Sequence, residues 1–332
     1  MPLTSFSRRT LLCAAIATTG AAAGLAALPS QAQTFPDKSI TLVVPFPAGA
    51  GPDAVARLLA QKLSVSLGQS VVVDNRAGAS GTLGAAFVAR APADGHTLLL
   101  TPNTFAIAPH LMGRGAATAD VVRDFTPIVQ IASTPIVLVA RPDLGVRDAR
   151  GLVELARKSK DITYGTSGSG SPMHIAGELF NRAAGIQTLH VPYKGVAPAV
   201  TDLLGGHLKL NYVSLASVMP HLQSGKLVAL ATVERERTPL LPELPTLIEQ
   251  GYKDVAVEAW YGLLGPRGLP EPVLQTLNQH VNAALRQPDV IEQLKGFGAT
   301  PVGGPPQRLA QRVQGDFTRY GRIVKEFGIQ AD

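Results

Sequence analysis

Cysteine is nearly absent from this sequence of 332 residues, since Cys13 is the only one. Cys13 lies in an uncharged, alanine-rich run, residues 11–28, which follows Arg8 and Arg9. A positive start followed by such a run is typical of an export signal, and we expect residues 1–32 to be removed. The remaining chain then contains no cysteine, which excludes a disulfide, a thiolate metal site and a cysteine nucleophile.

The expected cleavage site is Ser30-Gln31-Ala32, which fits the small-x-small rule. A membrane anchor stays open as an alternative, because the apolar run approaches the ~20 residues that a span needs. The export route is also open. Ser7 to Leu12 partly matches a twin-arginine signal, but Leu11 stands where phenylalanine is usual. The general secretory route is the alternative, and both routes end outside the cytoplasm.

Aromatic residues (5%) and charged residues (16%) are also scarce, whereas 45% of the chain is hydrophobic. This composition excludes a disordered chain and predicts a core of aliphatic side chains. The formal net charge of +6 falls to +4 once Arg8 and Arg9 leave with the signal. The basic residues are scattered, so we expect no nucleic-acid partner, although a mildly positive surface favours anionic solutes.

Signatures of catalysis and of metal binding are missing. Gly165 to Ser169 resembles a nucleophile elbow but ends in serine, and Gly49-Ala50-Gly51 lacks the third glycine of a dinucleotide site. No pair among the seven histidines has zinc-binding spacing on a helix. We therefore expect no enzyme activity, no cofactor and no metal, while a catalytic set assembled from distant residues stays an alternative.

Apolar periodicity predicts alternating strands and helices in a chain long enough for about two domains. The first block is predicted to contain strands at 40–46, 71–73 and 97–101, with helices at 52–67 and in the second half of 77–91. The second block is predicted to contain strands at 136–140, 162–165, 189–191 and 208–213, with helices at 148–158, 172–184 and 196–204. A strand at 257–264 and helices at 271–285, 290–297 and 306–327 follow. The pattern favours open, mostly parallel sheets flanked by helices, arranged in two α/β lobes.

A glycine-rich loop joins the first predicted strand to the first helix, with Ala48, Gly49, Ala50 and Gly51 at its centre. Small residues allow close approach to a ligand, and the free N–H groups and dipole of a helix start attract negative charge. Pro52 suits the first helical position, and Asp53 lies in the first turn. Asp53 is expected to brace the loop, because its charge opposes that of an anion.

A second loop in the other block repeats this arrangement. Gly165 to Pro172 follows a strand and precedes a helix, and it offers the hydroxyl groups of Ser167, Ser169 and Ser171. Such donors can hold a carboxylate without a lysine or arginine. The alternative for each loop is an ordinary strand-to-helix turn that uses glycine for its geometry. Two such loops at the carboxyl ends of strands favour a ligand site.

Around these loops the chain resembles the Bug family, the extracytoplasmic receptors of tripartite tricarboxylate transporters. The resemblance covers nearly the whole mature chain and depends on the order and spacing of short matching stretches. The stretches are 44–49, 73–78, 94–99, 164–171, 190–195, 202–206, 245–246, 260–262 and 301–304.

The resemblance implies a two-lobed periplasmic-binding-protein fold of type II, with two mixed sheets joined by two crossing strands. The crossings are expected near 133–135 and 257–261. One lobe would then contain residues 33–133 and 257–332, and the other residues 134–256. It also implies a small carboxylate in the cleft, membrane transporter subunits as partners, and we expect a monomer.

By resemblance, the first loop holds one carboxylate through backbone amides, and the second loop with His174 holds the other end of the ligand. Phe46 would pack on the carbon skeleton, and Tyr193 and Lys194 lie at a further strand end. For His174 a helix-start hydrogen bond is the alternative, for Lys194 a solvated charge, and for Trp260 core packing. The complete set of candidate ligand-binding residues is Phe46, Ala48, Gly49, Ala50, Gly51, Asp53, Thr101, Ser167, Gly168, Ser169, Gly170, Ser171, His174, Tyr193 and Ser214.

Several positions depart from the family pattern. Ala50 replaces a glycine, Pro52 replaces a hydroxyl residue, and Ala108 stands where asparagine is frequent. Tyr212-Val213-Ser214 replaces a Phe-Asp-Asn stretch. These changes remove polar groups and predict an unusual or more apolar ligand.

The sequence thus predicts a receptor that closes on its solute by hinge bending and delivers it to a transporter. A sensory receptor of the same fold that signals to a kinase stays an alternative, as does a periplasmic α/β enzyme.

Overall fold

The computed structural model describes residues 35–111 and 119–329. The predicted export signal, residues 1–32, lies outside the described residues. By its contacts the chain divides into Met1–Asp37, of which only residues 35–37 are described, and Lys38–Asp332. Within the described ranges, no helix combines the length and the apolar character that a bilayer span needs.

The first sheet has six strands in the order β11-β4-β10-β3-β1-β2. The strands are β1 (Ile40–Val44), β2 (Val71–Asn75), β3 (Thr97–Pro102), β4 (Phe125–Thr134), β10 (Ala259–Pro266) and β11 (Thr300–Pro301). β1 pairs in parallel with β2 and β3, whereas β10 is antiparallel to β3 and β4. β1 and β3 are almost continuously buried, as expected for strands covered on both faces.

The second sheet has five strands in the order β7-β6-β8-β5-β9. The strands are β5 (Ile136–Ala140), β6 (Thr163–Thr166), β7 (Leu189–Pro192), β8 (Leu210–Ser214) and β9 (Val228–Thr232). β6 is parallel to β7 and β8, while β5 is antiparallel to β8 and β9. The prediction of two mixed sheets flanked by helices is therefore confirmed. The expectation that the sheets are mostly parallel is wrong, because β4, β10 and β11 of the first sheet and β5 and β9 of the second pair in antiparallel fashion.

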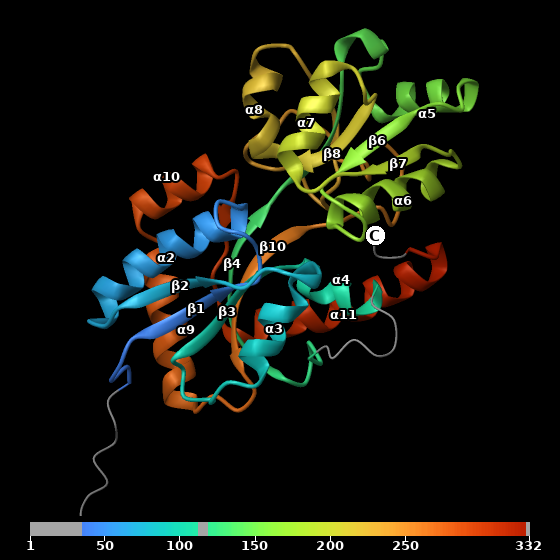
Figure 1. Cartoon of the computed structure of the whole chain (residues 1–332). Helices are drawn as coiled ribbons and strands as arrows, with labels where there is room; N and C mark the ends of the chain where they lie inside the picture. The colour runs from blue at the N-terminus through green and yellow to red at the C-terminus, as the bar shows by residue number, and fades with distance from the viewer. Residues whose placement is uncertain (1–34, 112–118, 330–332) are drawn as a thin grey trace, which may run out of the picture. The chain divides into compact units, whose positions relative to one another are not determined.

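Helices follow most strands and cover the sheets (Figure 1). Those beside the first sheet are α2 (Gly51–Leu67), η1 (Ala79–Gly81), α3 (Thr82–Ala89), α4 (Thr104–Leu111), α9 (Glu271–Leu285), α10 (Pro288–Gly296) and α11 (Pro306–Phe327). Those beside the second sheet are η2 (Pro142–Leu144), α5 (Ala149–Lys158), α6 (Pro172–Ala184), α7 (Val196–Gly205) and α8 (Leu215–Gln223). Helix α11, red in Figure 1, contacts both α4 and β4.

The chain passes between the sheets at two neighbouring places. Pro135 separates β4 from β5, because proline has no N–H for a continuous ladder. The return runs from β9 to β10, and Ala259 at the start of β10 pairs with Thr134 at the end of β4. Green β4 and orange β10 therefore lie side by side where the chain changes sheets (Figure 1).

Apolar side chains also connect α11 to the second sheet. A buried cluster centred on Leu138, Tyr164 and Phe180 extends to Tyr320 and Ile323 of α11. α11 therefore shares a core with the second sheet while it also packs on β4 of the first.

Candidate functional site

The first glycine-rich loop connects β1 to α2 and is held by hydrogen bonds within itself. The Gly49 N–H donates to Asp53 Oδ2 (N···O 2.8 Å), and the Ala50 N–H donates to the Pro47 carbonyl (3.2 Å). Gly49 has φ of +82°, a conformation that glycine adopts at low cost. The N–H groups of Ala48 and Gly51 have no hydrogen-bond partner within the described part of the chain. The described part of the protein therefore does not use these two donors near the start of α2.

Asp53 braces this loop from the first turn of α2. Its side chain is buried and also accepts from Arg57 Nε (3.0 Å) and Asn75 Nδ2 (3.0 Å), while Asn75 Nδ2 reaches the Phe46 carbonyl (3.1 Å). Burial pushes the pKa of Asp53 up, but the bonds from Arg57, Gly49 and Asn75 outweigh it, so the pKa is lowered. Asp53 is thus an ionised loop support, and its bonding capacity is used within the protein.

Aromatic and hydroxyl groups surround the first loop. The ring of Phe46 packs 3.4 Å from the position that a Cβ on Gly81 would take, and a Cβ on Gly51 would lie 2.9 Å from Tyr261 Oη. Burial raises the pKa of Tyr261 to about 12, so its hydroxyl stays neutral. Thr101 is buried at the end of β3, beside a crevice of about 10 Å³ that also touches Gly81. That space holds about one water molecule.

The second glycine-rich loop connects β6 to α6 and has the same type of brace. The Gly170 N–H donates to His174 Nδ1 (3.0 Å), four residues further along, and the Ser171 hydroxyl caps the helix by accepting from the His174 N–H (3.2 Å). The Thr166 hydroxyl contacts the N–H and the carbonyl of Gly168 (3.3 and 3.2 Å). The Ser167 hydroxyl lies 3.5 Å from the sulfur of Met173.

His174 is buried and stacks on the ring of His190, with centroids 3.7 Å apart and planes inclined by 13°. His190 Nε2 lies 2.7 Å from the Thr166 hydroxyl, so this histidine supports the same loop from β7. Beneath them, Tyr164 donates to Glu178 (2.5 Å), and burial together with Glu178 raises the pKa of Tyr164. An aromatic stack therefore holds the second loop in place.

The remaining candidate residues lie at the neighbouring strand ends. Tyr193 donates its hydroxyl to Asp202 of α7 (2.6 Å), and burial together with that bond raises its pKa to about 12. Its carbonyl lies 3.4 Å from the position of a Cβ on Gly168, so Tyr193 adjoins the second loop. Ser214 ends β8, with its hydroxyl 2.8 Å from that of Ser217, and Lys194 is exposed.

Contacts also join the elements that flank the two sheets. A Cβ on Gly170 would collide with the side chain of Leu111 at the end of α4. A Cβ on Gly298 would likewise meet Ala216 of α8. Glycine at these two positions allows close approach between parts of the chain that belong to different sheets.

Trp260 belongs to the core where β10 begins. It is 1% exposed, and its Nε1–H donates to Asp316 Oδ2 of α11 (2.7 Å). Arg312 joins the same carboxylate (3.2 Å) to Glu258 (2.6 Å), immediately before β10. Burial raises the pKa of Asp316 despite these partners. This network fixes α11 to the returning strand.

Sequence reasoning missed three residues that shape the loops. Asn75 ends β2, His190 lies on β7, and Tyr261 lies on β10. Each occurs in one of the short stretches that carried the resemblance, and that membership was the available signal. Within the described residues, no group of three or more histidine, cysteine, aspartate or glutamate side chains is arranged to hold a metal ion.

Comparison with known proteins matches residues 55–329 to the model of a family described as the tripartite tricarboxylate transporter family receptor. Protein BugT of Bordetella pertussis is 36% identical over 320 residues, covering 96% of this chain and 98% of BugT. The family model and the similarity to BugT thus both extend over nearly the whole described chain.

Solved structures agree as well. The periplasmic binding protein BugD is 34% identical, with a TM-score of 0.76, covering 90% of this chain and all (100%) of BugD. A structure of R. palustris Rpa4515 with adipate is 36% identical, with a TM-score of 0.79, covering 89% of this chain and 99% of that one. The predicted periplasmic-binding-protein fold is confirmed by these similarities.

Proposed function

The chain belongs to the tripartite tricarboxylate transporter receptor family, and from this we propose that it captures a small carboxylate between its lobes and delivers it to the membrane subunits of a transporter. The relative that was solved with adipate supports a carboxylate ligand. We propose binding without turnover.

One observation carries this proposal: both glycine-rich loops are braced in the same way. In each, a side chain from the first turn of the following helix accepts the N–H of a loop glycine four residues earlier. Asp53 does this for Gly49, and His174 for Gly170. A loop held in advance loses little conformational entropy when it binds, which favours an oriented set of donors.

The proposed ligand contacts are backbone N–H groups of the first loop and hydroxyl groups of the second loop. We propose that the N–H groups of Ala48 and Gly51 hold one carboxylate at the start of α2, with the neutral hydroxyl of Tyr261 beside them. The hydroxyl groups of Ser167 and Ser169 would face the other end of the ligand. Phe46 and Thr101 line the approach, and Tyr193 and Ser214 support the edges of the second loop.

Capture requires the lobes to move. The crevice lined by Thr101 and Gly81 holds about 10 Å³, much less than a dicarboxylate needs, and Leu111 packs on Gly170. We propose that bending at the neighbouring connections, 134–136 and 232–259, opens the site and closes it again. The lobes would be 33–133 with 257–332, and 134–256.

The location and the ligand type complete the proposal. Residues 1–32 would direct export to the periplasm and be removed, and the mature protein would act as a monomer. Pro52 has no N–H to offer, and Val213 replaces a family carboxylate, so the ligand is expected to have few polar groups between its charged ends. Saturated dicarboxylates of four to eight carbons are suitable first probes.

The test is a thermal-shift screen of such carboxylates on the mature protein, because a ligand far above its Kd raises the unfolding midpoint. Gly49→Asp places a fixed negative charge at the proposed anion site and should remove that ligand-dependent shift. Gly68→Asp is the matched control. Both glycines have positive φ (+82° and +68°) with nothing within 4 Å of an added Cβ, but Gly68 caps the other end of α2.

We expect both variants to lose similar stability, about 1–2 kcal/mol, because an L-residue is strained in this conformation. Only Gly49→Asp should lose the ligand response. A preserved response in Gly49→Asp would show that the first loop is not the site. Delivery is tested separately, by uptake of the identified ligand in cells that lack this protein.

A further inference from the structure

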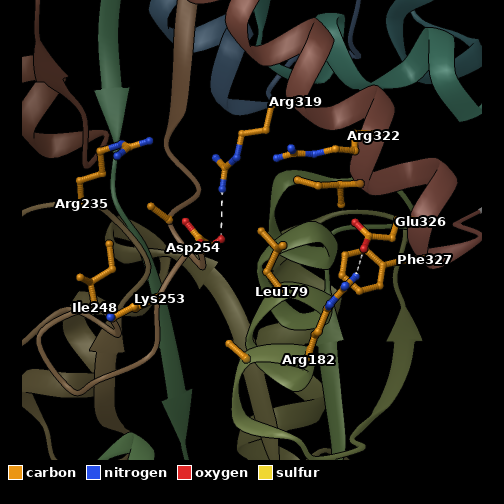
Figure 2. Close-up of a pocket in the computed structure, with 13 residues that line it drawn as sticks. Leu179, Arg182, Arg235, Ile248, Lys253, Asp254, Arg319, Arg322, Glu326 and Phe327 are labelled. Carbon is orange, nitrogen blue, oxygen red and sulfur yellow. Dashed lines mark hydrogen bonds and ion pairs between the residues drawn. The ribbon is translucent and has the colours of Figure 1, made fainter.

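A larger cavity lies away from the two glycine-rich loops. It has a volume of about 580 Å³ and lies between α6, the segment 235–256 and α11. Figure 2 shows Arg319 and Arg322 extending from α11 into this space, with Asp254 and Leu179 across from them. Cavities of roughly 300–1,000 Å³ are typical of small-molecule sites.

The cavity is strongly basic. Its lining contains five cationic side chains and two carboxylates, which leaves a net of three positive charges. The cations stand on three walls: Arg182 on α6, Arg235 and Lys253 on the segment, and Arg319 and Arg322 on α11. Repulsion among them is a cost that a bound anion would relieve.

Carboxylates neutralise only some of these cations. Arg182 forms an ion pair with Glu326, and Arg235 Nε lies 3.8 Å from Glu258 Oε1. Arg319 Nη2 donates to the Asp254 carbonyl (3.4 Å), which carries no formal charge. Lys253 and Arg322 form no ion pair or hydrogen bond with the described residues.

The remainder of the lining is apolar, with Leu179, Ile248, Ile323 and Phe327 between the charged groups. Figure 2 places the ring of Phe327 beside Arg182 and Glu326. A ligand that is charged at several points and carries a compact skeleton would match both parts of this lining.

We propose that this cavity binds a small multivalent oxyanion of about three negative charges, held between α11 and the segment 235–256. The charged groups of this anion contact Lys253 and Arg322 first, because these two cations have no carboxylate partner among residues 35–111 and 119–329. Arg319 and Arg235 complete the site from the same walls. This inference is independent of the function proposed for the glycine-rich loops, because no residue of those loops lines the cavity.

The test uses citrate and pyrophosphate as probes, titrated calorimetrically into the mature protein at low ionic strength and at ~0.15 M salt. Citrate carries its charges on a carbon skeleton and pyrophosphate does not, so the two arms distinguish a carboxylate from a phosphate ligand. At least one probe should bind. Its affinity should fall in the higher salt, because exposed charges are screened.

The decisive variant is Lys253→Gln with Arg322→Gln, which removes two charges from the cavity lining but no hydrogen bond or ion pair among the described residues. Loss of one charge-assisted hydrogen bond costs about tenfold in affinity, so the double variant should bind at least about tenfold more weakly. Arg286→Gln with Lys295→Gln removes the same charge from exposed positions outside the cavity and should bind like the unmodified protein. Without anion, the thermal midpoint of the cavity variant should be no lower than that of the control variant, because the cavity variant loses only charges that repel one another.

The proposal is overturned if neither probe binds, or if the two double variants bind equally. It is also overturned if Gly49→Asp removes the binding, because the probe then occupies the loops. Conversely, a failure of the carboxylate screen at the loops leaves this cavity proposal intact, since the variants separate the two sites.

Discussion

The brace formed by Asp53 gives the sharpest prediction about stability. Asp53 is 3% exposed and accepts hydrogen bonds from Gly49 N, Arg57 Nε and Asn75 Nδ2. Asp53→Ala leaves the Gly49 N–H and the Asn75 amide without this acceptor and removes a negative charge from the helix start. We expect a loss of about 2–4 kcal/mol in the free energy of unfolding, mostly from the two neutral donors.

The Arg57 ion pair contributes little to this figure. The Arg57 side chain is 56% exposed, and exposed pairs are worth about 0–1 kcal/mol. Asp53→Asn keeps one carbonyl acceptor and should cost about half as much as Asp53→Ala. Asp289→Ala is the matched control. Like Asp53, Asp289 lies in the first turn of a helix and pairs with a cation, here Lys62, but its side chain is 54% exposed.

Urea unfolding followed by circular dichroism measures all three variants. The reasoning is refuted if Asp53→Ala destabilises the protein no more than Asp289→Ala does. The pH dependence gives a second check. Because folding lowers the pKa of Asp53 below 3.8, its stabilisation is present above about pH 4 and is lost as the pH falls through the folded-state value. The difference between the unmodified protein and Asp53→Ala should therefore shrink in acid.

Two further predictions concern the region around β10. Burial raises the pKa of Glu234 from 4.5 to about 7; the charge of Glu258 adds to this effect and that of Arg312 opposes it. Ionisation of Glu234 therefore lowers the free energy of unfolding by its full amount above about pH 7, and has no effect below pH 4.5. Glu234→Gln should then stabilise the protein at pH 8, by at most about 3 kcal/mol, but not at pH 4, and an equal effect at both pH values in urea titrations would contradict this. Trp260→Phe removes the donor to Asp316 and leaves a gap beside Leu309, and it should cost about 2–4 kcal/mol in the same assay. A loss below ~1 kcal/mol would mean that the network with Arg312 does not depend on Trp260.

Elements with strong local signals could be predicted to the residue. Helices α6, α9 and α11 begin and end where the periodicity indicated, because each has proline in its first turn and α6 and α11 end at a left-handed glycine. Helices α4 and α8 were missed. They have eight and nine residues and contain Pro109 and Pro220, so a helix there depends on tertiary packing.

Strand β4 was missed for a related reason. It contains Pro127, Gln130 and Ser133, which break the apolar pattern, yet it is mostly buried between β10 and β11. Its ten residues are strand because partners from far along the chain complete the ladder, and such pairing leaves no local signature.

For the candidate site, the sequence located the loops and the brace Asp53, but not the other groups that support the loops. The role of Asp53 as a brace could be anticipated from its place in the first turn. The contacts of Asn75, Tyr261 and His190 depend on which strands become neighbours, and β10 is distant in sequence from both loops. The bond from Gly170 to His174 depends on a ring orientation that its stack with His190 fixes.

The position of β10 also determines the order in which the two sheets can be completed during synthesis. Every strand of the second sheet lies between Ile136 and Thr232, so that sheet can assemble as soon as this stretch has left the ribosome or the export channel. The first sheet cannot, because β10 separates β3 from β4 and is made after them. The N-terminal strands therefore stay unpaired on one side until the last third of the chain has been synthesised. During that interval the nascent chain is most prone to aggregation, because the edge of β3 is exposed.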